Sequence, residues 1–259
     1  MTGSDSEKPR ASRGCGLPWA IAGVAVLLLL LLALLPPSTP RPRPHAQCMN
    51  SLKLIGLALH NYHDEHGALP PAVMRGPDGT PWHSWRVLLL PYLDQPGLFK
   101  EYRFDEPWNG PHNRTLAEKM QWPYVFQCPA DRNATRESTN YLAVVGDRTL
   151  WPEGRSLTFG DVPDGISETI LVVEVADSGI HWMEPRDLEF DAMEFSINAQ
   201  DGPGIRGHHP GEERWGPDGP PRAFVLMGDG SIRALDTETA PESIQSMLLR
   251  DDRSRSISH

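Results

Sequence analysis

The segment QCMNSLKLIGLALHNYHDEH, Gln47–His66, determines how the rest of the chain is interpreted. Apolar residues recur along it at intervals of three and four positions, namely Cys48, Leu52, Ile55, Leu59 and Tyr62. This spacing places them on one face of an α-helix. Gly67 and then Pro70-Pro71 follow, and both are signals that end a helix. We therefore expect an amphipathic helix that buries one apolar stripe.

An uninterrupted apolar run precedes this helix. Residues 17–35 read LPWAIAGVAVLLLLLLALL and contain no charge. As a helix rising 1.5 Å per residue, the run would span roughly 28 Å, close to the ~30 Å hydrocarbon core of a bilayer. A cleaved signal peptide is the alternative, but the run is too long for one and no small-residue cleavage site follows it. We expect an uncleaved transmembrane helix in contact with membrane lipid.

Basic residues beside the run indicate its orientation. Lys8, Arg10 and Arg13 precede it, whereas only Arg41 and Arg43 follow. This small excess favours an N-terminus inside the cell and a C-terminal domain outside the cytoplasm. The expected organisation is a cytoplasmic tail (1–16), a transmembrane anchor (17–35), a proline-rich linker (36–45), an exported domain (46–250) and a polar tail (251–259).

Composition excludes several classes of protein. The chain has 259 residues, a formal net charge of −10 and three cysteines. The negative charge argues against binding of nucleic acid by phosphate neutralisation, so we expect no nucleic-acid partner. Three cysteines are too few for a disulfide-dense miniprotein. No GxxxxGKT, HExxH or GxSxG motif supports the enzyme classes that these patterns mark.

The second half of the chain is predicted to be mainly β. Four runs rich in β-branched and apolar residues are expected as strands: Asn140–Val145, Thr169–Val175, Ala223–Met227 and Ser231–Leu235. Gly228-Asp229-Gly230 separates the last two runs and predicts a hairpin. Pro241–Leu249 is expected to be a short closing helix. Asp177–Arg222, rich in glycine, proline and acids, is interpreted as a long surface insertion.

The middle of the chain is predicted to be less regular. Pro70–His83 is interpreted as a loop, and Ser84 as the N-cap of a helix that Pro91 interrupts. A short helix is expected near Thr115–Met120. Three neighbouring aromatic residues are expected to pack under loops, namely Trp108, Trp122 and Tyr124. Together the elements predict the α+β class with an antiparallel sheet.

Five stretches are informative in combination: Gln47–Ala72, Ser84–Asn113, Cys128–Asp131, Thr139–Gly146 and Asp161–Asp191. Together they resemble a bacterial family known as domain of unknown function 1559, whose members are prepilin-like exported proteins. The resemblance implies a pilin-like domain, in which a long first helix packs on an antiparallel sheet. It implies no established enzymatic activity, and it places the anchor in a bacterial inner membrane.

The N-terminus departs from the family pattern. Members begin with a prepilin peptidase site, a basic residue followed by Phe-Thr-Leu-Ile-Glu, whereas this anchor begins RGCGLPWAIAGV. Five prolines then interrupt the path from the anchor to the first predicted helix: Pro36, Pro37, Pro40, Pro42 and Pro44. Because proline breaks a helix interior, the continuous rod of a pilin is not expected. We predict that the chain is neither processed nor polymerised as a true pilin.

The family's C-terminal signature is a histidine followed after nine residues by Asp-Gly. His208 with Asp218-Gly219 fits this spacing literally, but that Asp-Gly lies between two prolines. In the family the Asp-Gly lies between two strands. His209 with Asp229-Gly230 is therefore the preferred match, with an insertion of about ten residues.

Two polar clusters have simpler explanations than chemistry. The first cluster lies at the end of the predicted helix and consists of His60, His63, His66, Asp64 and Glu65. A metal site needs three or four converging ligands, and a helix end rich in polar residues does not by itself supply them. The second cluster consists of Glu174, Asp177, His181, Trp182, Glu184 and Asp187. These residues could perform acid–base chemistry, but we interpret them as part of a polar loop. We predict no catalytic residue, metal ligand or cofactor.

Cys48 and Cys128 are expected to form a disulfide. Both lie in the predicted exported domain, where oxidation is permitted. Cys48 belongs to the apolar stripe, and Cys128 begins CPAD just before the first predicted strand. Two buried free thiols are the alternative. Cys15 would lie on the cytoplasmic side and stay reduced.

These inferences lead to a functional hypothesis. The chain is expected to be a membrane-anchored, pilin-like exported protein with a structural or assembly role, and its partners would belong to the cell envelope or secretion apparatus. A cell-surface module that binds a glycan or a cation is the alternative, supported by eight tryptophans and acidic loops. A hydrolase is the third possibility.

Overall fold

The first predicted helix is the longest helix that the computed structural model describes. It is α2 (Pro44–His66), and the structure describes residues 44–119, 123–209 and 220–252, all within one compact unit. The predicted stripe is confirmed: Tyr62 packs at the edge of the core, and four of its members are fully buried, namely Cys48, Leu52, Ile55 and Leu59. The helix begins at Pro44 rather than Gln47, since proline suits a first helical turn. Pro44 and His45, the last two residues of the predicted linker, therefore belong to the helix, and residues 36–43 lie outside the described residues.

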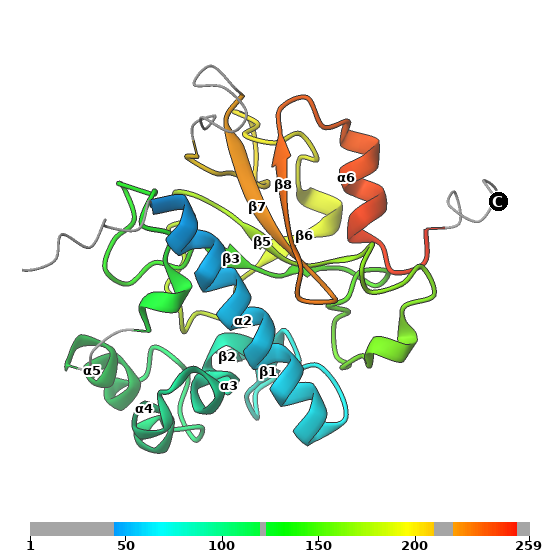
Figure 1. The fold of residues 1–259 in the computed structure, drawn as a ribbon. Helices are drawn as coiled ribbons and strands as arrows, with labels where there is room; N and C mark the ends of the chain where they lie inside the picture. The colour runs from blue at the N-terminus through cyan, green and yellow to red at the C-terminus, as the bar shows by residue number, and fades with distance from the viewer. Residues whose placement is uncertain (1–43, 120–122, 210–219, 253–259) are drawn as a thin grey trace, which may run out of the picture. The chain divides into compact units, whose positions relative to one another are not determined.

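A four-stranded antiparallel sheet forms the centre of the fold, in the order β3-β5-β7-β8 (Figure 1). Its strands are β3 (Tyr141–Leu142), β5 (Ile170–Glu174), β7 (Arg222–Met227) and β8 (Ile232–Asp236). The hairpin between β7 and β8 is confirmed, and Gly230 adopts a positive φ of 83° in its turn. Glycine is favoured there because a side chain would be strained. The predicted α+β class is thus correct.

Helix α2 packs directly on β7 and β8. A Cβ on Gly56 would lie 2.9 Å from Cδ1 of Leu226, so the helix approaches the sheet where a side chain is missing. At the C-terminal end, Nε2 of His60 lies 2.9 Å from the carbonyl oxygen of Gly228 in the hairpin turn. Packing and a long-range hydrogen bond both hold the helix on this face.

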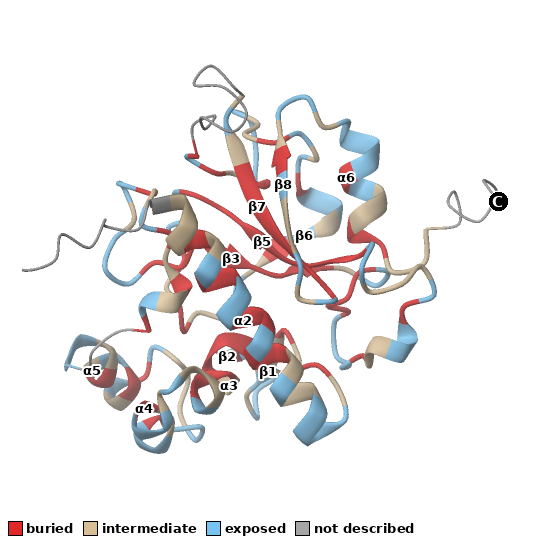
Figure 2. Cartoon of the chain, viewed as in Figure 1, coloured by how far each residue is buried: buried red, intermediate tan, exposed pale blue. Residues whose placement is uncertain are grey.

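Both faces of the sheet are covered. Phe224 and Leu226 of β7 join the core that contains α2, whereas the alternate residues Ala223, Val225 and Met227 join a second core. Helix α6 (Pro241–Leu248) contributes Ile244 and Leu248 to this second core. Figure 2 shows β5 and β7 as buried along most of their length. The central strands are therefore apolar on both sides, as expected for strands buried between two layers.

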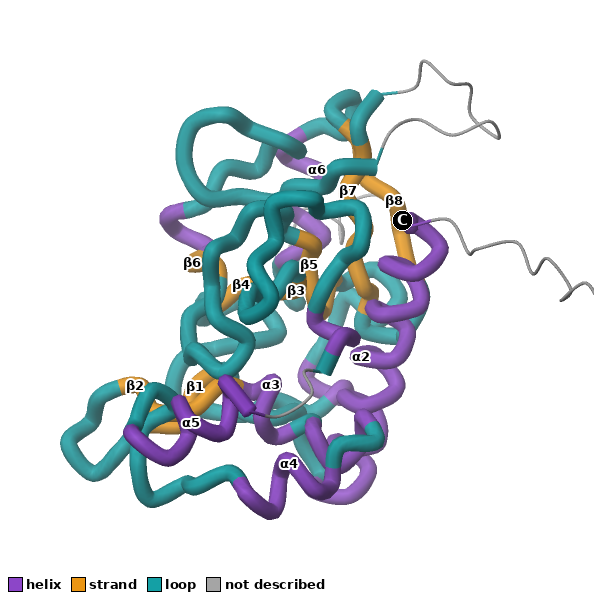
Figure 3. The backbone as a smooth tube through the Cα atoms, turned by 90° about the vertical axis from the view of Figure 1, so that its left-hand side faces the viewer, coloured by secondary structure: helices purple, strands orange, loops and turns teal. Residues whose placement is uncertain are grey.

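The segment Asp177–Arg222 was predicted to be a surface insertion, and this is wrong. It covers the second face of the sheet with buried apolar residues, namely Ile180, Leu188, Met193, Ile197 and Ile205. It also contains β6 (Leu188–Glu189), which pairs in parallel with β4 (Val144–Val145). The glycines and prolines allow this irregular path, and Figure 3 shows how much of the backbone is loop. The composition gave no sign of these buried positions because they have no regular period.

The middle of the chain contains more structure than predicted. Pro70–His83 is not all loop, because β1 (Val73–Arg75) and β2 (Pro81–Ser84) form a hairpin. Ser84 caps α3 as expected, and its side chain accepts a hydrogen bond from the backbone N–H of Arg86. The break at Pro91 is also confirmed, since α3 (Trp85–Leu88) gives way to the 3-10 helix η1 (Leu90–Leu93).

Shorter elements complete the fold. They are α4 (Pro96–Glu101), α5 (Pro111–Lys119) and the 3-10 helices η2 (Tyr124–Phe126), η3 (Phe159–Asp161) and η4 (Phe190–Ala192). Helix α5 begins four residues before the predicted Thr115. Asn140–Val145 is not one strand, because β3 and β4 pair with different neighbours.

The prediction for the neighbouring aromatic residues is correct only in part. Trp108 packs partly against the core as expected, but Tyr124 is 58% exposed, so it does not lie under a loop. Asp251, in the predicted polar tail, accepts a hydrogen bond from Nε of Arg148 at 3.0 Å. Trp122 lies outside the described residues.

The predicted tail and anchor over residues 1–35 also lie outside the described residues. Among residues 44–119, 123–209 and 220–252, no helix combines the length and apolar character that crossing a membrane requires.

Candidate functional site

A disulfide joins the first helix to the segment that precedes the sheet. Cys48 of α2 and Cys128 are bonded, with their Cα atoms 4.8 Å apart, which confirms the predicted pair. Both residues are buried. The backbone N–H of Cys128 donates to Oδ1 of Asn140 at 2.8 Å, and the Tyr141 hydroxyl donates to the carbonyl oxygen of Cys48 at 3.1 Å. Both halves of the bond are therefore held by residues at the start of β3.

A buried acid–histidine pair lies against this disulfide. Nε2 of His209 lies 2.8 Å from Oε1 of Glu174 and 3.5 Å from Sγ of Cys128. Oε2 of Glu174 accepts a hydrogen bond from the backbone N–H of Phe224 at 2.8 Å, and the Phe224 ring lies 4.5 Å from the His209 ring. The two side chains are at most 3% exposed.

Asp131 organises the polar residues beside the pair. Its Oδ2 accepts hydrogen bonds from Nδ2 of Asn140 at 2.6 Å and from the backbone N–H of Asp177 at 2.9 Å. Its Oδ1 accepts from the backbone N–H groups of Asn133 and Ala134. Four N–H donors thus bind this carboxylate, and it caps the CPAD turn.

An open pocket of about 520 Å³ lies on the outer side of this region. Its lining includes Asp177, Asn198, Gln200, Arg206, His208 and His209. At its rim, Nε2 of His208 lies 2.9 Å from Oδ2 of Asp177. This hydrogen bond lowers the pKa of the Asp177 carboxyl. His209 forms part of the wall of this pocket, so the acid–histidine pair borders it.

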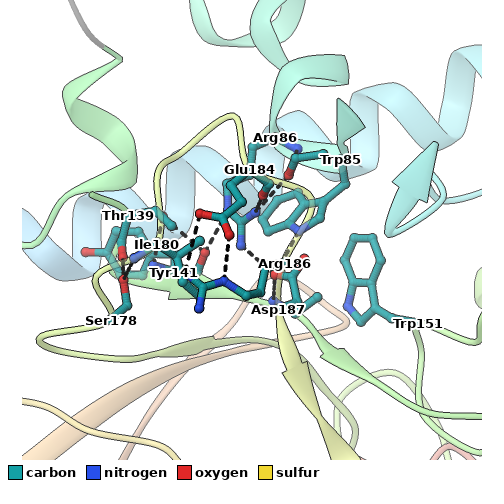
Figure 4. A network of polar contacts seen from close by, with 12 residues as sticks. Trp85, Arg86, Thr139, Tyr141, Trp151, Ser178, Ile180, Glu184, Arg186 and Asp187 are labelled. Carbon is teal, nitrogen blue, oxygen red and sulfur yellow. Dashed lines mark hydrogen bonds and ion pairs between the residues drawn. The ribbon is translucent and has the colours of Figure 1, made fainter. Parts of the chain in front are cut away.

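A second buried network surrounds Arg86 (Figure 4). Arg86 and Asp187 form an ion pair in which neither side chain is exposed. Arg86 also donates to the carbonyl oxygen of Tyr141 and to the hydroxyl of Ser84. Oδ1 of Asp187 accepts from Nε1 of Trp85 at 3.2 Å as well. Burial raises the pKa of the Asp187 carboxyl, and the charge of Arg86 opposes that rise.

The candidate acid–base residues therefore pair with different partners. Glu174 contacts His209, Asp177 contacts His208, and Asp187 contacts Arg86. Glu184 forms an ion pair with Arg186, and burial lowers the pKa of His181 to about 4. Trp182 is buried in the core. Sequence reasoning included Glu174 among these candidates, but it gave no sign that His209 and the disulfide would lie beside it.

The helix histidines also serve separate contacts. His60 bonds to the hairpin turn, as described above, and Nε2 of His63 accepts from the backbone N–H of Phe159 at 3.4 Å. Nδ1 of His66 lies 3.1 Å from the carbonyl oxygen of Tyr62. Asp64 and Glu65 are exposed at the same end of the helix. These contacts fit the interpretation of a polar helix end.

The residues assigned to the family signature lie at opposite ends of β7. His209 forms a bridge with Arg222 at the start of the strand. Asp229 and Gly230 form the turn after it, where Oδ1 of Asp229 accepts from the backbone N–H of Ser231 at 2.9 Å. The signature thus spans the strand that contacts both cores. Each end has its own local role, and the assignment itself stays a prediction.

Comparison with known proteins finds one matching family. Residues 43–154 match the family described as protein of unknown function (DUF1559), a region that runs from α2 past β4 and ends before β5. No curated protein and no solved structure matches the chain. The match confirms, for residues 43–154, the resemblance to the family of domain of unknown function 1559 that the five sequence stretches indicated.

Proposed function

We propose that this chain is a membrane-tethered, exported protein with a pilin-like domain and a structural or assembly role in the cell envelope or secretion apparatus. The observation that carries the proposal is the buried Cys48–Cys128 bond between α2 and the start of the sheet. Disulfides persist in oxidising compartments and are rare in the cytosol. A domain fastened by such a bond is therefore suited to a location outside the cytoplasm.

The architecture supports the pilin-like part of the proposal. A long first helix packs on an antiparallel sheet, which is the arrangement that the family resemblance implies. The sheet is covered on its other face as well, so the domain needs no partner to complete its core. A self-sufficient domain on a proline-rich tether suits display on the membrane rather than polymerisation through a helical rod.

Fractionation and proteolysis test the location. The native chain should resist extraction by alkaline carbonate, and protease added outside the inner membrane should degrade the domain beyond about residue 38. Mass spectrometry should find the unprocessed N-terminus. A soluble mature chain that begins after residue 35 would instead identify a signal peptide.

Polymerisation is tested separately, and a processed, methylated N-terminus or sheared filaments containing the chain would contradict the proposed tethered state. Photocrosslinking in cells tests the assembly role. The chain should crosslink to an envelope or secretion protein, and the reciprocal experiment from that partner should recover the chain. A chain that stays uncrosslinked from every exposed position would contradict this role.

A ligand-binding module is a second candidate, favoured by the 520 Å³ pocket. Its wall combines two amide side chains, Asn198 and Gln200, with the charged groups of Arg206 and Asp177. Such groups suit a small polar ligand. Thermal-shift titration with oligosaccharides and divalent cations tests this function, with Gln200→Ala as the pocket variant. Equal shifts of the melting temperature in the variant and the parent would exclude this pocket as the binding site.

A further inference from the structure

We propose that, when the Cys48–Cys128 bond is reduced, the two thiolates, His209 and Glu174 form a four-ligand site for Zn²⁺. One donor atom from each of these four buried residues lies within 4.8 Å of the other three. They come from α2, the CPAD turn, the end of β5 and the segment before β7. Two thiolates, an imidazole and a carboxylate are all donors that zinc prefers.

After reduction, small displacements would bring the four donors to the spacing of a tetrahedral zinc site. With Zn–S bonds of about 2.3 Å and Zn–N or Zn–O bonds of about 2.0 Å, neighbouring donors lie roughly 3.3–3.8 Å apart. Nε2 of His209 already lies 3.5 Å from Sγ of Cys128. The two sulfurs must separate on reduction, and the 2.8 Å contact between His209 and Glu174 must lengthen slightly.

The surrounding bonds hold the donors in place without the disulfide. The backbone N–H of Phe224 holds Oε2 of Glu174, which leaves Oε1 directed at His209. The backbone N–H of Cys128 is held by Asn140, and the carbonyl oxygen of Cys48 by Tyr141. Contacts of this kind orient metal ligands and strengthen binding.

The protons can be accounted for. Nδ1 of His209 is buried and has no hydrogen-bond partner among the described residues. When the metal binds Nε2, the ring proton resides on Nδ1, and metal bonds replace the hydrogen bond between Nε2 and Oε1 of Glu174. A phosphine reductant converts the disulfide and one water to two thiols and the phosphine oxide. Metal binding then releases the two thiol protons.

Cobalt titration tests the site on the full-length chain in detergent, carrying Cys15→Ser so that only two thiols are present. After reduction with a phosphine, Co²⁺ should bind once per chain and give a thiolate-to-cobalt charge-transfer band that Zn²⁺ abolishes. If reduction unfolds the domain, Co²⁺ should restore its circular dichroism, because binding free energy is then folding free energy.

Four controls make the result decisive. The oxidised chain and the double variant Cys48→Ser/Cys128→Ser should give no charge-transfer band. Glu174→Gln and His209→Ala should each weaken binding tenfold or more and shift the cobalt spectrum. A reduced chain that gives no band, or one whose affinity and spectrum are unchanged in both variants, would overturn the four-ligand site.

Discussion

At the scale of single residues, two buried pairs of polar side chains lie near Tyr141. Arg86 donates to the carbonyl oxygen of Tyr141 and pairs with Asp187, while Glu174 lies opposite Tyr141 in the β3–β5 register and pairs with His209. Burying a charge is costly unless a partner and hydrogen bonds compensate it. Each pair is therefore expected to be far more sensitive to the loss of one member than a surface ion pair would be.

Arg86 and Asp187 should behave as one unit. Arg86→Met or Asp187→Asn should each destabilise the domain by about 3–5 kcal/mol, because each leaves an uncompensated buried group. The double variant should cost clearly less than the sum of the single variants. Urea unfolding of all four proteins provides the measurement. The exposed pair Arg148–Asp251 is the matched control, expected to change stability by less than about 1 kcal/mol. Additive single effects would show that the two residues do not depend on each other.

His181 should make stability depend on pH. Burial lowers its pKa to about 4 in the folded state, whereas an unfolded histidine titrates near 6.5. The unfolded chain binds the proton more readily, so the contribution of His181 is complete above about pH 6.5 and is lost as the pH falls towards 4. Unfolding free energies measured at pH 7 and pH 4.5 should differ less in His181→Gln than in the parent. An equal difference in both proteins would assign the pH dependence to other groups.

At the scale of elements, close backbone contacts decide how the irregular segment before β7 meets the sheet. A Cβ on Gly207 would lie 2.2 Å from the carbonyl oxygen of Arg222 and 2.6 Å from Cα of Ala223. Backbone atoms cannot move aside as the end of a flexible side chain can. The segment therefore depends on glycine here for close approach rather than for an unusual backbone angle.

Gly207→Ala should destabilise the domain by about 1–3 kcal/mol, since it overpacks a contact with backbone. Gly97→Ala is the matched control, because a Cβ at Gly97 meets nothing within 4 Å and the position lies in α4. The control should be neutral or slightly stabilising through helix propensity. Thermal unfolding of both variants checks the prediction. Equal melting temperatures for the two variants would contradict the packing of the segment against β7.

At the scale of the whole described domain, the central sheet is the middle one of three layers. Helix α2 covers one face, while α6 and the irregular segment cover the other. The disulfide links the first layer to the start of the sheet across a sequence separation of 80 residues. A crosslink that closes so long a loop restricts the unfolded chain strongly.

Loss of this crosslink should lower stability by about 2–5 kcal/mol. Cys48→Ala/Cys128→Ala should therefore unfold at lower urea concentration than the parent in the presence of a metal chelator. Leu57→Ala on the exposed side of the same helix is the control and should change little, since Leu57 is 58% exposed. Unchanged stability of the double variant would mean that the sheet and α2 hold together without the bond.

The sequence by itself determined those features that have a local pattern. The stripe of α2, the cap at Ser84, the break at Pro91 and the hairpin at Gly228-Asp229-Gly230 each depend on spacing or on a turn residue, so they could be predicted correctly. Only the tertiary structure decided what covers the second face of the sheet, and that Glu174 and His209 lie beside the predicted disulfide. Cys48, Cys128, Glu174 and His209 are far apart along the chain, and no periodicity connects them. Their proximity follows from the packing of α2 on a sheet whose strand order differs from chain order.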